Sequence, residues 1–102
     1  LLEGFHALKT GQLLSFSEQQ IVDCASSAGE GCGGGWPYLA VEYAAEQGLE
    51  LESQYPYTAE NGNCEFNAAD ANKVNSGYAF VTNYNVDALK SAIAAGPVSV
   101  LV

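Results

Sequence analysis

Three cysteines, Cys24, Cys32 and Cys64, constrain this chain more strongly than any other feature of its sequence. Because three is an odd number, at least one thiol has no partner within the 102 residues. The cysteines form no Cys-x-x-Cys pair, and His6, the only histidine, lies far from them in sequence. We therefore expect neither a metal site nor a cofactor, and interpret the cysteines as disulfide-forming residues of an oxidising compartment. The odd cysteine suggests that the chain is a piece of a larger protein.

Acidic residues dominate the charge. Twelve Asp and Glu stand against three Lys, which gives a net charge of −9 at pH 7. Nucleic acids and anionic membrane surfaces attract basic proteins, so neither is an expected partner. The uncharged stretch 91–102 is too short to span a bilayer and is interrupted by Gly96-Pro97. The acidic run between Lys9 and Lys73 fits a solvated surface, an acidic working compartment or attraction of cationic substrates, and charge alone leaves all three open.

Apolar spacing and capping residues predict four helices. Ser17 and Gln20 have the spacing of a capping box, and Phe16 with Ile21 forms the matching hydrophobic staple. Ile21 and Val22 are expected to pack inward. The expected helices are one that ends near Thr10-Gly11, one over Glu18–Cys24, one over Pro37–Gln47 and one that begins near Val86 and is closed by Gly96-Pro97.

Two apolar, β-prone segments predict strands. The first covers 78–82, and the second, 97–102, has the sequence of a buried strand. The long segment 49–76 carries turn residues and no sustained period, so it is expected to form a loop with short extended pieces.

Residues 25–35 contain five glycines and predict a loop. The run Gly33-Gly34-Gly35 lacks the pattern of nucleotide-binding loops, so a phosphate site is not expected. Two interpretations stay open: a flexible loop before a helix, and a glycine edge whose backbone hydrogen-bonds an extended peptide. No cysteine has an evident catalytic base, and His6 is expected on the surface of its helix near Glu3.

Several motifs occur together in a characteristic order: Ser17–Cys24, Gly31–Pro37, Tyr55-Pro56-Tyr57, Cys64 and Gly96–Val100. In this order, and spanning the whole chain, they resemble segments of papain-like cysteine peptidases. The resemblance implies an α+β, papain-like cysteine proteinase fold. It makes 1–102 a partial peptidase domain, with most of the mainly helical left domain and the start of the β-rich right domain.

The same resemblance implies that no catalytic residue lies in this chain. The nucleophilic cysteine would lie upstream of Leu1, and the catalytic histidine and asparagine beyond Val102. Cys24 would pair with Cys64, and Cys32 with a cysteine upstream of the chain.

Substrate contacts are implied as well. Two glycines match those whose backbone holds the substrate peptide, three residues match the pocket for the second residue before the cleaved bond, and one falls near the next subsite. In that order they are Gly34 and Gly35; Trp36, Pro37 and Leu101; and Glu30. Gly33 replaces the usual asparagine, and Trp36 is bulkier than many residues at its position, which predicts a more flexible loop and a shallow pocket.

The implied function is a cysteine-type endopeptidase that hydrolyses peptide bonds through a thiolate acyl-enzyme, with this segment supplying the non-primed substrate groove. Expected partners are peptide or protein substrates, with the protein's own propeptide and cystatin-like inhibitors as further candidates. The expected location is lysosomal, vacuolar or secreted. One alternative is an inactive papain-like homologue that binds peptides. Another is an unrelated disulfide-stapled module that is complete at 102 residues and unfolds in a sharp two-state transition.

Overall fold

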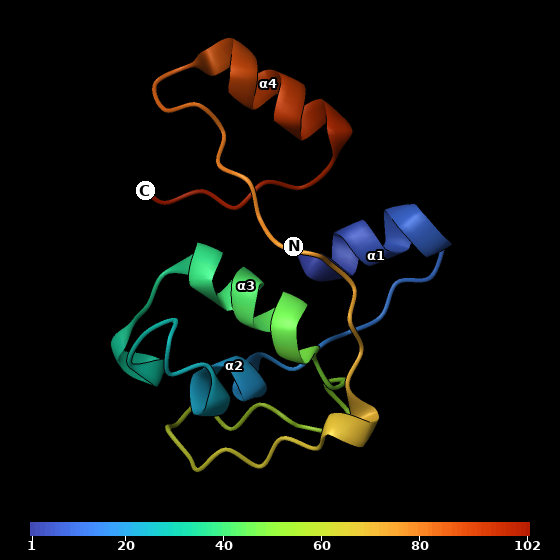
Figure 1. Ribbon diagram of the computed structural model, residues 1–102, viewed down its shortest axis with the longest axis vertical. Coiled ribbons are helices and arrows are strands. Elements are labelled where there is room, and N and C mark those ends of the chain that lie inside the picture. The colour runs from blue at the N-terminus through green and yellow to red at the C-terminus, as the bar shows by residue number, and fades with distance from the viewer.

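The computed structural model describes every residue from Leu1 to Val102. Four α-helices and two short 3-10 turns are joined by irregular segments (Figure 1). The four predicted helices are confirmed, and none of them is long and apolar enough to cross a membrane. The elements are α1 (Leu2–Thr10), α2 (Glu18–Cys24), the 3-10 turn Gly31–Gly33, α3 (Pro37–Gln47), the 3-10 turn Ala68–Asp70 and α4 (Val86–Ala95).

The residues at the start of α2 form one of the two hydrogen bonds of the predicted capping box. The Ser17 hydroxyl accepts a hydrogen bond from the Gln20 backbone N–H at 3.0 Å, which confirms the predicted N-cap. The second half of the capping box is wrong, because the Ser17 N–H donates to the Glu50 carbonyl at 2.9 Å instead. The Gln20 side chain is therefore free to bond elsewhere.

The burial pattern of α2 also differs from the prediction. Its buried residues are Gln19 and Gln20, whereas Ile21 and Val22 are only partly buried. Ile21 does pack against the core cluster that contains Phe16, as the predicted staple requires. Two buried glutamines are possible because their amides bond to the backbone of neighbouring segments, which offsets the cost of burying them.

The hydrophobic core is small and lies between α3 and the segments beside α2. Phe16, Ala44 and Leu49 form its centre. Eleven of the 102 residues are buried, and four of these are Ser17, Gln19, Gln20 and Glu50. The interior therefore depends on hydrogen bonding as well as on apolar contact. Partly buried side chains surround the centre: Leu2, Leu14, Ile21, Tyr43, Leu51 and Val74.

The predicted strands are wrong. Neither 78–82 nor 97–102 pairs with another segment, and Leu101 is 70% exposed rather than buried. Tyr78 and Phe80 instead pack edge-on with Tyr38, with ring centroids 5.2–5.3 Å apart. A β-prone sequence becomes a strand only where another backbone lies alongside it, and residues 1–102 place none there.

Single β-bridges take the place of sheets. Phe16 pairs with Leu51, and Leu49 pairs with Asn72, both in antiparallel fashion. These bridges confirm the expected loop with short extended pieces over 49–76.

Helix α1 contacts both the C-terminal segment and the part of the molecule that contains α2 and α3. Figure 1 shows α4 and the C-terminal segment set apart from α2 and α3, with α1 to one side. Gly4 lies so close to Pro97 that an added Cβ would be 3.1 Å from its ring. His6 is half-buried and packs edge-on against Phe16, with ring centroids 6.0 Å apart, so its predicted place on the helix surface is wrong.

Candidate functional site

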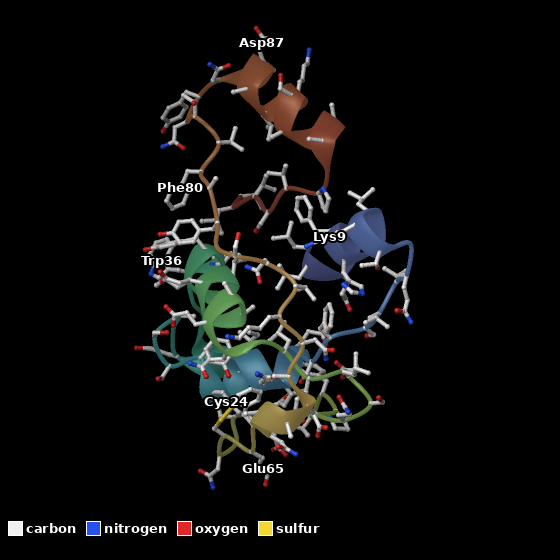
Figure 2. All side chains as sticks on the ribbon, turned by 45° about the vertical axis from the view of Figure 1, so that its right-hand side comes forward. Lys9, Cys24, Trp36, Glu65, Phe80 and Asp87 are labelled. Carbon is white, nitrogen blue, oxygen red and sulfur yellow. A yellow bond between two sulfur atoms is a disulfide. The ribbon has the colours of Figure 1, made fainter.

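Two of the three cysteines pair as the resemblance implies. Cys24 and Cys64 form a disulfide across 40 residues of sequence. Cys32 is a free, exposed cysteine. Because the disulfide joins the end of α2 to the loop 58–65, it fixes that loop beside the helix (Figure 2).

Two side chains of α2 hold the same loop by hydrogen bonds. The Asp23 carboxylate accepts from the Tyr55 hydroxyl at 2.8 Å and from the Gly62 N–H at 3.0 Å. The Gln19 amide donates to the Glu60 carbonyl at 2.8 Å and to Asp23 at 2.7 Å. The loop is thus tied to α2 on both sides of residue 61.

Residues 28–36 form an ordered turn that we name the glycine hairpin. The Glu30 N–H donates to the Gly34 carbonyl at 2.8 Å, and the Trp36 N–H donates to the Ala28 carbonyl at 2.7 Å. Between these bonds the chain reverses through the 3-10 turn Gly31–Gly33. The segment is therefore not the unstructured loop that its composition also permitted.

The hairpin needs glycine for two separate reasons. At Gly35, an added Cβ would lie 2.6 Å from the Ala28 carbonyl oxygen, so the two backbones approach too closely for a side chain. At Gly34, φ is +120°, a backbone conformation that residues with a side chain rarely adopt. The sequence suggested that these glycines allow a ligand to approach the backbone closely. In the structure, the close approach is between the two sides of the hairpin itself.

Gly35 has a free hydrogen-bonding edge. It forms an antiparallel bridge with Gly29, and the two bonds that flank this bridge belong to the neighbouring residues. In such a pair, the N–H and C=O of each residue point away from the partner. The Gly35 N–H and C=O accordingly take part in no hydrogen bond within the chain, and Gly35 is exposed. This edge can bind an extended peptide as an added strand.

Four of the six predicted substrate residues lie together. Gly34, Gly35, Trp36 and Pro37 line a cavity of about 250 Å³ between the hairpin and α2. The Trp36 side chain is 58% exposed at the start of α3, and Figure 2 shows it on the same side of the molecule as Phe80. On the α2 side the cavity is lined by Ile21, Val22 and Ala25.

The other two predicted residues lie outside this cavity. Glu30 is exposed on the hairpin, where its carboxylate lies against Gly33. Leu101 is exposed on the C-terminal segment. Their roles at a substrate pocket stay predictions.

Sequence reasoning missed Gln19 and Asn61, which support the hairpin, and the buried role of Gln20 beside the end of α3. Their backbone partners Glu60, Gly48 and Cys32 lie 28 to 41 residues away along the chain, so no local pattern predicts these bonds. The available signal was the pair of adjacent glutamines in a helix of seven residues. When both are buried, the buried face of that helix is polar rather than apolar.

Two ionisable groups near these segments are perturbed. A hydrogen bond to the Glu52 carboxyl raises the pKa of Glu18, with burial and the nearby Glu3 charge adding to the effect. Burial raises the pKa of Tyr55, and the Asp23 charge acts in the same direction. The structure gathers no group of three His, Cys, Asp or Glu side chains that could hold a metal ion.

Comparison with known proteins identifies the family to which this chain belongs. The family model described as papain family cysteine protease matches residues 1–102. The chain belongs to the papain family of cysteine proteases. This confirms the resemblance on which the expected fold rested, and the mainly helical structure corresponds to part of the papain-like fold.

Relatives from several organisms share this papain-family segment. Digestive cysteine proteinase 1 of Homarus americanus is 42% identical over 105 aligned residues, in an alignment that covers 99% of this chain and 33% of that protein. Caricain of Carica papaya is 42% identical over 102 aligned residues, in an alignment that covers 99% of this chain and 29% of caricain. The chain thus spans about a third of the length of these relatives.

Solved structures of cysteine proteases also match the fold of this chain. Digestive procathepsin L 3 of the Tenebrio molitor larval midgut superposes with a TM-score of 0.85 at 38% identity, covering 91% of this chain and 31% of that one. A Carica candamarcensis cysteine protease in complex with E-64 gives a TM-score of 0.83 at 39% identity, covering 93% of this chain and 45% of that one.

Proposed function

We propose that this chain is part of a cysteine endopeptidase and supplies the non-primed side of its substrate groove. The complete enzyme would attack a peptide carbonyl with a thiolate and release the acyl-enzyme by hydrolysis. The thiolate, its histidine and the asparagine belong to parts of the enzyme outside residues 1–102. Cys24 and Cys64 have no nucleophilic role, because they are joined to each other.

The free edge of Gly35 carries this proposal. Its unpaired N–H and C=O would bond the backbone of the second substrate residue before the cleaved bond, and Gly34 leaves the approach open. Trp36 and Pro37 follow directly and would form one wall of the pocket for that residue's side chain. Leu101 is proposed for the opposite wall, and Glu30 for the next subsite.

Backbone methylation of the substrate tests the proposal without altering the protein. The full-length protein is incubated with peptides that differ only in which backbone nitrogen carries a methyl group. Methylation at the second residue before the cleaved bond removes the donor to Gly35, so KM should rise about tenfold or more there. Methylation at the fourth residue should change KM little. Equal losses at both positions would contradict the proposed role of Gly35.

The same assay separates the active enzyme from an inactive homologue. An endopeptidase cleaves the unmodified peptide and loses activity when its nucleophile is alkylated. A homologue that only binds peptides would retain the methylation pattern in its affinities but would yield no cleavage product.

We further propose the setting in which this enzyme works. A disulfide and a net charge of −9 support a lysosomal, vacuolar or secreted location, and related proteins carry names such as digestive cysteine proteinase. Similarity to a procathepsin supports a propeptide as a partner beside peptide or protein substrates, with cystatin-like inhibitors as a further candidate. Residues 1–102 would form most of the left domain and the start of the right domain.

A further inference from the structure

We infer that Asn61 is a positioning residue for substrate binding, because its side-chain carbonyl holds the turn of the glycine hairpin that presents Gly35. This inference rests on the proposed function of Gly35. It assigns to Asn61 no contact with the substrate itself.

The first observation is a hydrogen bond between two distant segments. The backbone N–H of Cys32 donates to Asn61 Oδ1 at 2.8 Å, across 29 residues of sequence. Cys32 is the middle residue of the 3-10 turn Gly31–Gly33, and N–H groups at the start of a helical turn have no partner within it. Asn61 therefore caps the tip of the hairpin from outside.

The second observation is that the hairpin is shaped around this side chain. Gly31 has a φ of +58°, and the atom nearest to an added Cβ there would be Asn61 Oδ1. The Val22 carbonyl oxygen would lie 3.1 Å from the same position. A side chain at residue 31 would thus displace Asn61, so glycine at this position and asparagine at 61 depend on each other.

The third observation is that Asn61 itself cannot move freely. The residues on either side of it are held by α2, since the Glu60 carbonyl accepts from Gln19 and the Gly62 N–H donates to Asp23. The disulfide at Cys64 holds the end of the loop. Asn61 thus links the hairpin to a loop that α2 holds in place.

The turn has three backbone hydrogen bonds of its own, from the N–H groups of Glu30, Gly33 and Gly34, and the Asn61 side chain adds the bond that ties it to another segment of the chain. Its glycines have no side chains with which to pack, and glycine backbones lose more conformational freedom on ordering than any others. Without the Asn61 bond, the turn would sample more conformations, and Gly35 would be presented in the binding geometry for a smaller fraction of the time. Substrate binding would weaken, whereas the chemistry at the cleaved bond would be unaffected.

The test compares Asn61→Ala with a matched control in the full-length enzyme. Asn63→Ala changes an exposed residue of the same loop that takes no part in these hydrogen bonds. Each variant is assayed on a long peptide that reaches Gly35 and on a short substrate with a single residue before the cleaved bond. Asn61→Ala should raise KM for the long peptide about three- to tenfold, with kcat and the short substrate nearly unchanged. Asn61→Asp, which keeps the acceptor oxygen, should restore the KM.

Hydrogen exchange provides a readout that does not depend on activity. The backbone amides of residues 31–35 should exchange faster in Asn61→Ala than in Asn63→Ala. Equal exchange in the two variants, an unchanged KM for the long peptide, or an equal loss on both substrates would overturn the role of Asn61 while leaving the proposed function standing. If the unaltered enzyme cleaves neither substrate, the proposed function fails, and this inference fails with it.

Discussion

Gln20 offers the sharpest test of how this segment is held together. Its side chain is completely buried. The amide nitrogen donates to the Gly48 carbonyl at 3.0 Å and to the Tyr43 hydroxyl at 3.1 Å, and the amide oxygen accepts from the Glu50 N–H at 2.8 Å. One side chain therefore satisfies the backbone where α3 ends and the next segment begins.

Gln20→Leu keeps nearly the same volume and removes all three hydrogen bonds. The Gly48 carbonyl and the Glu50 N–H have no other partner and both residues are buried, so each would be left unsatisfied. Each such group costs about 1–3 kcal/mol, and burying a leucine side chain returns about 1.5–3 kcal/mol. On the central values, the free energy of unfolding should fall by about 2 kcal/mol.

Urea unfolding of the full-length protein measures this difference. Gln12→Leu is the matched control, because Gln12 is exposed and its side-chain amide makes no hydrogen bond in the structure. The control should change the free energy of unfolding by no more than about 0.5 kcal/mol. If Gln20→Leu were as mild as Gln12→Leu, the reasoning about buried backbone groups would be refuted.

Gln20→Glu adds a dependence on pH to the same site. A carboxylate still accepts from the Glu50 N–H, but only a protonated carboxyl can donate to the Gly48 carbonyl. Folding should therefore raise the pKa of the new carboxyl above its unfolded value. The variant should approach the stability of the unaltered protein below the unfolded pKa and lose that stability as pH rises through the folded one.

Three further predictions concern other groups. A hydrogen bond to Glu52 raises the pKa of Glu18 above its ordinary 4.5, so the folded state holds this proton more tightly than the unfolded state. As pH rises through the folded pKa, the protein should therefore lose stability relative to Glu18→Gln. Unfolding midpoints of the two proteins, measured at several pH values, check this. Tyr55→Phe removes the donor to Asp23 and should lower the unfolding free energy by about 1–2 kcal/mol, measured by urea titration. Leu101→Phe should weaken cleavage of peptides with a large second-position residue more than of those with a small one, and equal losses would argue against the pocket assignment.

The helices could be predicted from sequence because their signals are local. Ser17 caps α2 through the N–H of a residue three positions later, and Gly11 ends α1 in a left-handed conformation with φ of 78°. Pro37 occupies the first turn of α3, where its missing N–H costs nothing. All these interactions lie within one turn of the residue that announces them.

The strands failed for the opposite reason. The segments 78–82 and 97–102 are apolar and β-prone, but pairing depends on where a distant backbone lies. The same limit left the glycine edge as one of two open interpretations, because the free edge of Gly35 exists only where Gly29 pairs with its other side. The glycine run indicated that something approaches closely, but composition could not say whether a ligand or the chain's own backbone does so.

Helix α2 explains how so small an apolar core can support a binding edge. Its polar side chains bond outward in two directions: Gln20 to the segment after α3, and Gln19 with Asp23 to the loop 58–65. The partners in these distant segments are mostly backbone groups, with the Tyr43 and Tyr55 hydroxyls as the exceptions, so these contacts mainly fix the course of the chain. Since that loop carries Asn61 to the hairpin, a continuous series of hydrogen bonds runs from the interior to the turn that presents Gly35. An apolar α2 would bury more hydrophobic surface but would leave these distant backbone segments without a common anchor, and the geometry of the edge would no longer be defined.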